Sequence, residues 1–434
     1  MRNTIQKILA GTLMMTVLAS GTACAKNGTA ETTVPVKTDA VSYKATLAKQ
    51  EISAFPDAFV SGINQYGWTA AAELYDGKNL ALSPASLELA LLMTKTGAVG
   101  DTADQMKSAL FMTGLSDDEI LKASKQLMWR TNTNGMEAAN SVWMQKDYGF
   151  SEDYIRTLND SFMSDAFAVD FSKDAKSATD SINSWASDKT HGKIPEMNPA
   201  PLPSDTKMVL INALYFLGDW QSPFAAADSY KENFKTADGD VETMFMHKSE
   251  ADLLYSETKD YQMISMPFKG AEGDADSPYS MAFILPAEGS DIHELMNTIA
   301  KDGFSPAVKG MTNETVNLSL PKFEFTFDTS MVKTMEDLGM TKAFTDAAEF
   351  DKMTGAPNSL AISDILHKCY IRVDEEGAEA AAVTEVIMVE TALAPQDNVK
   401  NFVADRPFLF AIYDETDNTV LFLGAVANPA EDAG

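Results

Sequence analysis

The stretch "LSPASLELALLMTKTGAVGDTADQM" (82–106) carries the most specific local signals in the chain. Ser83 followed by Pro84 predicts a helix start, because Pro suits the first helical turn. Apolar residues between 90 and 93 give this helix a face to bury, and glycines at 97 and 100 end it. A second helix is expected to start in "TADQMKSAL" (102–110). The stretch therefore predicts two consecutive helices joined by a glycine-containing turn.

The flanking sequence predicts more helices early in the chain and mostly strands later. Apolar residues at helical spacing cover 52–75, and "MVLINALYFLGDW" (208–220) has the continuous apolar character of a strand buried on both faces. The stretch "VNLSLPKFEFTFD" (316–328) alternates as a strand, and 401–426 has the pattern of a hairpin with a polar turn. This order indicates an α+β fold with large antiparallel sheets.

The composition excludes one class of partner. The 434 residues are 45% hydrophobic and 22% charged, which is ordinary for a globular chain and enough for a large core. The 63 acidic residues outnumber the 34 basic ones, so the net charge is −29. Nucleic acid is not an expected partner, because binding it needs a basic face. The negative charge is interpreted as a solubility feature of an exported protein rather than as steering toward a basic partner.

The N-terminal segment (1–24) has the pattern of a secretory signal. Two basic residues precede an apolar run at 8–19, which is too short to span a bilayer. The segment ending at Cys24 resembles a bacterial lipobox, and cleavage by an ordinary signal peptidase within "ACA" (23–25) is the alternative. Lipidation of Cys24 would tether an exported, extracellular protein to the outer face of the cell membrane. Residues 25–50 are rich in Thr, Ala and Lys and are expected to form a flexible tether.

A search for catalytic chemistry finds no motif. The four histidines are scattered, and "HELMN" from His293 lacks the second His of a zinc-binding helix. No G-x-S-x-G, P-loop, G-x-G-x-x-G or C-x-x-C motif occurs. Cys369 lies in a strand-like alternation (366–374), where a buried apolar role is favoured over that of a nucleophile. These observations favour binding or inhibition over catalysis, and neither a cofactor nor a metal is expected.

Six stretches, in order, resemble the serpin family over about 52–428. The stretch 82–106 is similar to the family's S-P-x-S helix and the G-A-x-G-x-T that follows it, and "INALYFLGDWQSPF" (211–224) is similar to its N-x-x-Y-F-x-G-x-W-x-x-x-F strand. The other matches are "INSWASDKTHGKI", "LPKFEF", "LHKCYIRVDEEGAEAAA" and "FVADRPFLFAI". The two longest motifs are highly specific, so the chain is identified as a member of this family, of a bacterial exported or lipoprotein type.

The resemblance implies a single serpin domain over 51–434, with three β-sheets, about nine helices and an exposed reactive-centre loop at about 375–401. It implies a buried polar "shutter" where the central sheet must part, formed by Ser83, Ser86, Asn212 and His367. It also implies a "breach" at the top of that sheet, formed by Trp220, Lys322 and Glu375. Without the resemblance, Asn212 and Trp220 would be ordinary core residues. Lys322 and Glu375 would then be two unrelated surface charges rather than an ion pair.

The stretch "DEEGAEAAAVTEVIMVETALAP" (374–395) is where the resemblance places the loop. Laid out as a strand, one of its faces has no charge: Ala378, Ala380, Ala382, Thr384, Val386 and Met388. Small residues can enter a packed sheet, whereas an unpaired charge on this face would oppose burial. The hinge consists of Glu375, Glu376, Gly377, Ala378, Glu379, Ala380, Ala381 and Ala382, and Gly377 supplies a permissive pivot. Helix propensity alone would instead favour a helix over 375–391.

The resemblance implies a suicide-substrate inhibitor of a serine protease, and not an enzyme. A protease would cleave the loop, and insertion of the loop into the central sheet would trap the acyl-enzyme. The family distance from Gly377 places the reactive bond at Thr391–Ala392, to within a residue or two. The alternative is a non-inhibitory serpin used for binding or carriage.

Residues near the reactive bond indicate the class of target. Thr391 and Ala392 suit a narrow pocket, so an elastase-like or subtilisin-like protease is favoured. Glu390 would suit a glutamyl-specific protease, and Met388 or Leu393 would suit a chymotrypsin-like protease or a papain-like cysteine protease. Trypsin-like targets are not expected, because the sequence from 375 to 399 contains no Lys or Arg. A monomer is expected, in contact with a membrane only through the lipid on Cys24.

Overall fold

The computed structural model describes residues 55–131, 136–162, 164–216, 218–270, 277–378 and 398–431, with the backbone alone at 136–138, 214 and 215. All of them belong to one compact unit, Thr38–Gly434. Within these ranges, no helix is both long and apolar enough to cross a membrane.

The described residues form ten α-helices, against the roughly nine expected. Their bounds are α1 (Asp57–Leu74), α2 (Pro84–Lys95), α3 (Gly100–Ala109), α4 (Asp117–Thr131), α5 (Glu152–Thr157), α6 (Phe171–Lys189), α7 (Ile292–Asp302), α8 (Phe304–Lys309), α9 (Val332–Asp337) and α10 (Asp351–Thr354). The predicted helix start is confirmed, because Ser83 caps α2 by accepting the backbone N–H of Ser86 at 3.2 Å. The helix predicted over 52–75 is α1.

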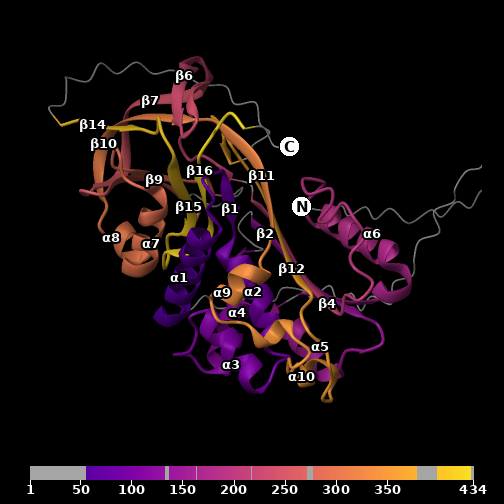
Figure 1. Ribbon diagram of the computed structural model, residues 1–434. Helices are drawn as coiled ribbons and strands as arrows, with labels where there is room; N and C mark the ends of the chain where they lie inside the picture. Colours follow the sequence, from indigo (N-terminus) through magenta and orange to yellow (C-terminus); the bar gives the residue numbers. More distant parts are fainter. Residues whose placement is uncertain are drawn as a thin grey trace, which may run out of the picture. The chain divides into compact units, whose positions relative to one another are not determined.

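The described strands form three sheets, as expected (Figure 1). The central sheet has five strands in the order β11 (Phe323–Ser330), β12 (Asp364–Val373), β4 (Met208–Phe216), β2 (Met136–Gln145) and β3 (Asp165–Val169). The largest sheet has nine strands, with β6 (Ser229–Thr236) paired to β7 and the others in the order β1 (Leu80–Leu82), β16 (Thr419–Val426), β15 (Phe408–Asp414), β9 (Tyr279–Pro286), β8 (Tyr261–Pro267), β7 (Gly239–Glu257), β10 (Thr312–Pro321) and β14 (Lys400–Val403). A two-stranded sheet pairs β13 (Gly377–Ala378) with β5 (Gly218–Asp219).

The two faces of the central sheet are buried in different ways. Val209 and Ile211 of β4 belong to a hydrophobic cluster that also contains Ile182 and Trp185 of α6. Leu210, which lies between them in the sequence, belongs to the main core together with apolar residues of α2 such as Leu87 and Leu91. Met208 and Phe216 belong to the same core, as expected because side chains alternate along a strand. This periodicity places Asn212 on the face of the sheet that lies against α2.

The alternating stretch 316–328 is two strands rather than one. β10 ends at Pro321 and belongs to the nine-stranded sheet, whereas β11 begins at Phe323 and is an edge of the central sheet. The alternation changes phase at the break: the apolar positions buried in β10 are even-numbered, from Val316 to Leu320, whereas Phe323 and Phe325 of β11 are odd-numbered. The spacing of three between Leu320 and Phe323 marks the break in the sequence, but a period of two does not tell which sheet each half joins. The break places Lys322 between the two sheets.

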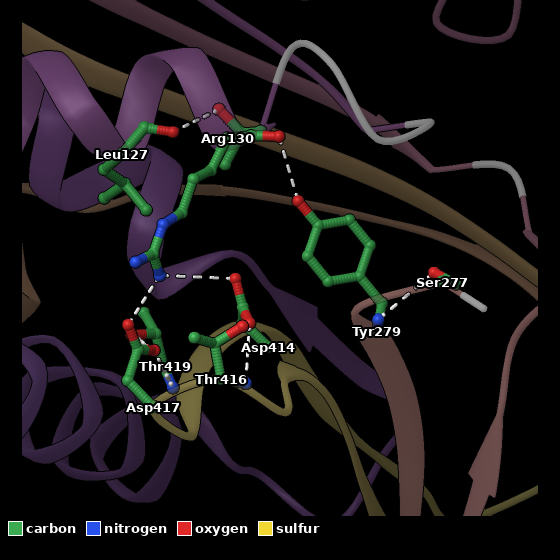
Figure 2. Close-up of polar contacts among 9 residues, drawn as sticks. Leu127, Arg130, Ser277, Tyr279, Asp414, Thr416, Asp417 and Thr419 are labelled. Carbon is green, nitrogen blue, oxygen red and sulfur yellow. Dashed lines mark hydrogen bonds and ion pairs between the residues drawn. The ribbon is translucent and has the colours of Figure 1, made fainter. Parts of the chain in front are cut away.

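A buried ionic cluster joins α4 to the hairpin of β15 and β16 (Figure 2). The Arg130 guanidinium lies 2.5 Å from an Asp417 carboxylate oxygen and 3.4 Å from one of Asp414. It also lies 4.1 Å from the ring centroid of Phe55, and the Tyr279 hydroxyl donates to the Arg130 backbone carbonyl at 3.0 Å. Burial raises the pKa of Asp414, with a smaller contribution from the Asp417 charge. The cluster fixes the end of α4 just before β2 of the central sheet.

Replacing Arg130 by Met should destabilise the fold by about 3 kcal/mol, because it leaves the buried Asp414 and the partly buried Asp417 without their cation. Urea unfolding followed by circular dichroism measures this loss. Lys176→Met is the matched control, since it removes an exposed ion pair with Asp180 and should leave the urea midpoint nearly unchanged. Equal midpoints for the two variants would show that the cluster does not stabilise the fold.

Candidate functional site

The candidate site lies where two parallel strands of the central sheet meet. β12 and β4 are paired from Asp364–Val209 to Cys369–Leu214. β12 continues to Val373, and this last part of the strand is paired with β11 but not with β4. Tyr370–Val373 therefore have a strand neighbour on one side only among the described residues. The sheet is thus continuous from Asp364 to Cys369 of β12 and parted beyond Cys369, at the end called the top of the sheet.

The chain reverses direction at the end of β12. The Asp374 N–H donates to the Gly377 carbonyl at 3.0 Å, and an Asp374 carboxylate oxygen accepts the Glu376 N–H at the same distance. Residues 377–378 then form β13, antiparallel to β5. The helix that propensity favours from 375 is wrong for 375–378, because the Asp374 side chain stabilises a turn there instead.

The hinge begins in the parted region of the sheet. Ala378 is 3% exposed and lines a cavity of ≈ 10 Å³ beside Phe216 of β4 and Ile371 of β12. A Cβ on Gly377 would lie 2.0 Å from the Gly218 carbonyl oxygen. Gly377 is thus required by the close approach of two backbones, which differs from the conformational freedom expected from sequence.

The breach residues hold the start of the hinge. The Lys322 ammonium lies 2.5 Å from a Glu375 carboxylate oxygen, which also accepts the Ser229 hydroxyl at 2.7 Å. Burial opposes the ionisation of Glu375, yet these two hydrogen bonds hold its pKa below its usual range. The Trp220 backbone N–H donates to the Glu376 carbonyl at 2.7 Å, and its indole N–H donates to the Asp374 carbonyl at 3.0 Å. The structure thus brings all three predicted breach residues together.

The four predicted shutter residues form one buried network across α2, β4 and β12. His367 Nδ1 lies 2.6 Å from Asn212 Oδ1, and Asn212 Nδ2 donates to the Ser86 hydroxyl at 2.6 Å. The Ser83 hydroxyl donates to the Leu421 carbonyl at 2.6 Å. His367 and Asn212 are also a register pair of β12 and β4, so their hydrogen bond crosses the boundary between these strands.

Two members of this network were not expected from the sequence. Asn212 Nδ2 donates to Asn140 Oδ1 of β2 at 2.6 Å, and the Cys369 sulfur lies 3.1 Å from His367 Nε2. Cys369 has no exposed surface, in agreement with its predicted burial. A signal for both was available: Asn140 is an isolated amide within a strand, and Cys369 is two residues from His367 and so shares its face.

Some predicted site residues lie outside the described ranges. They are the lipidation residue Cys24, the hinge residues Glu379, Ala380, Ala381 and Ala382, and the reactive bond Thr391–Ala392. Among the described residues, no group of three or more His, Cys, Asp or Glu side chains is arranged to hold a metal ion.

The buried His367 should make stability depend on pH. Burial lowers its pKa from 6.5 to about 3, so the unfolded chain takes up a proton in a pH range where the folded chain does not. The stability that the neutral His367 permits is therefore fully present above pH 6.5 and is lost as the pH falls toward 3. It should amount to about 2 kcal/mol between pH 7 and pH 5.

Urea unfolding at the two pH values tests this expectation. His367→Gln should remove that part of the pH dependence, whereas His293→Gln, at an exposed position, should keep it. The expectation fails if the wild type and His367→Gln lose the same free energy of unfolding between pH 7 and pH 5.

Comparisons with known proteins agree with this geometry. The family model described as serpin (serine protease inhibitor) matches residues 62–429. An uncharacterized serpin-like protein of Thermococcus kodakarensis is 32% identical over 377 residues, covering 86% of each chain. Intracellular coagulation inhibitor 2 of Tachypleus tridentatus is 31% identical, covering 84% of this chain and 90% of that protein.

A solved structure shows the same architecture. The thermophilic serpin Tengpin in its native state is 30% identical with a TM-score of 0.78, and the match covers 88% of this chain and 96% of that chain. Serpins are in general inhibitors of serine proteases and not enzymes. The sheet arrangement, the matched family model and these relatives together show that the chain belongs to the serpin family.

Proposed function

We propose that this serpin inhibits a serine protease as a suicide substrate. The observation that carries the proposal is the start of the hinge: Gly377 and Ala378 pair antiparallel with β5 at the top of the central sheet, next to the end of β4. A segment that follows β12 through a reverse turn runs antiparallel to β12, and therefore also to β4. Such a strand can hydrogen-bond to both neighbours and fill the parted region.

The sequence beyond the hinge supports insertion. Ala378 is already buried, and strand alternation would place Ala380 and Ala382 on the same face. These side chains are small and uncharged, so the main core could accept them with little rearrangement. Insertion before hydrolysis of the acyl-enzyme would carry the attached protease away from its productive geometry.

The proposed target is an elastase-like or subtilisin-like protease, with a cysteine protease as the second option. Thr391 and Ala392 at the proposed bond are small, and the lack of Lys and Arg from 375 to 399 disfavours trypsin-like enzymes. The proposed location is extracellular: a bacterial protein is exported through the 1–24 signal and tethered to the outer face of the cell membrane by lipidated Cys24. The sequence pattern of the first 24 residues supports this location.

The inhibition proposal predicts a covalent complex that survives SDS. The purified protein is mixed with an elastase-like protease, and a band at the summed mass should appear together with a released C-terminal peptide. The mass of this peptide locates the cleaved bond. Clean cleavage by a broad panel of proteases, with no complex and no gain in thermal stability, would instead support a non-inhibitory serpin.

A charge on the inserting face should convert the inhibitor into a substrate. Ala380→Glu or Ala382→Arg should stall insertion, because an unpaired charge would enter the main core. The acyl-enzyme then hydrolyses, so complex disappears while cleavage continues. Ala381→Glu is the matched control, since strand alternation places it on the opposite face and it should still form complex. Normal inhibition by Ala380→Glu would contradict the insertion mechanism.

A further inference from the structure

Cys369 and His367 form a fully buried pair on the face of β12 that lies against the main core. The Cys369 sulfur is 3.1 Å from His367 Nε2, and the Ser83 backbone N–H points to the same nitrogen at 3.4 Å. Neither side chain is more than 1% exposed. A backbone N–H can only donate, so Nε2 accepts. The neutral ring therefore carries its proton on Nδ1.

The other side of the ring leads to the same assignment. His367 Nδ1 lies 2.6 Å from Asn212 Oδ1, an acceptor, while the amide nitrogen of Asn212 donates to Ser86 and Asn140. Hydrogen bonds thus run in one direction, from the thiol through the imidazole and the amide to the Asn140 side chain. They connect β12, β4 and β2, which are adjacent in the central sheet.

The protonation states agree with this direction. Burial lowers the pKa of His367 to about 3, so the ring is neutral at pH 7. Burial raises the pKa of the Cys369 thiol, so the sulfur keeps the proton that it donates. The thiol is therefore a hydrogen-bond donor here and not a nucleophile.

Cys369 also occupies a particular place in the register. The Cys369–Leu214 pair is the last of the β12–β4 ladder, and the His367–Asn212 pair lies two residues further into it. If β12 and β4 separate progressively from the top of the sheet, the separation would break the Cys369–Leu214 pair first and the His367–Asn212 pair later. The thiol stands at the boundary between the open and the closed part of the sheet.

We propose that Cys369 is a positioning residue for sheet opening: its thiol holds His367 in the tautomer and orientation that bridge β12 to β4. This inference rests on the proposed function in one respect, since loop insertion requires these strands to separate. Removing the thiol donor leaves Nε2, among the described residues, with only the longer contact from the Ser83 N–H. The bridge is then weaker, and β12 should separate from β4 more often.

Three substitutions distinguish this role from space filling. Cys369→Ser keeps a donor, and Cys369→Val fills the space without one. Ile365→Val is the matched control, because it removes one methylene from a fully buried residue of the same strand and leaves the network intact. If Cys369 only fills space, Cys369→Val should behave more like the wild type than Cys369→Ser does.

The first measurement is the ¹⁵N spectrum of the imidazole rings, with His367 assigned by the His367→Gln variant. The wild type should show a proton on Nδ1 and a hydrogen-bonded Nε2. Cys369→Val should shift the Nε2 resonance downfield, Cys369→Ser should restore it, and Ile365→Val should leave it unchanged. A proton on Nε2 in the wild type overturns the proposal even if a variant fails to fold.

The second measurement is hydrogen exchange of the β12 amides, which reports separation from β4 without any protease. Cys369→Val should exchange about tenfold faster than wild type, the effect of one lost hydrogen bond to a buried acceptor, and Cys369→Ser should stay near wild type. Equal exchange in the wild type and Cys369→Val, or slower exchange in Val than in Ser, would refute the role. If the exchange results hold but no protease forms a complex, the inhibition proposal fails while the role of Cys369 stands.

Discussion

The pairing of β4 with β12 is the contact on which the rest of the structure depends. The two strands are parallel neighbours in the sheet, although β4 ends at Phe216 and β12 begins only at Asp364. Their boundary is bridged by backbone hydrogen bonds and by the His367–Asn212 contact of 2.6 Å. When the strands are paired, the polar groups of this bridge satisfy each other's hydrogen bonds. When the strands separate, the same groups can form hydrogen bonds with other partners, whereas apolar side chains cannot.

The top of the sheet lies beyond the last residue pair of the β12–β4 ladder, Cys369–Leu214. Lys322 and Trp220 hold residues 374–376 in a turn, so that Ala378 enters the region beyond the end of the β12–β4 ladder. The entry depends on a backbone contact that only glycine permits at 377. In the proposed mechanism, this clamped turn beside an open gap would direct insertion from the parted top toward the shutter.

Much of the fold could be predicted from local chemistry. The Ser83 cap, the apolar stretch of β4 and the terminal hairpin all follow from residues close together in the chain. The break at Lys322 shows in the sequence only as a change of phase in the alternation, and this change does not tell that the two strands join different sheets. The same limit applies to Asn140 and Cys369: strand periodicity gives the face that each occupies, but not the partner that it meets.

The sequence by itself determined the elements, the family resemblance and the small uncharged residues of the loop. Only the tertiary structure decided that His367 meets Asn212, that Cys369 lies against the same ring, and that Gly377 is needed for close approach rather than for flexibility. The physical reason is distance along the chain. Local patterns act through neighbouring residues, whereas the shutter depends on the register of two strands that lie far apart in the sequence.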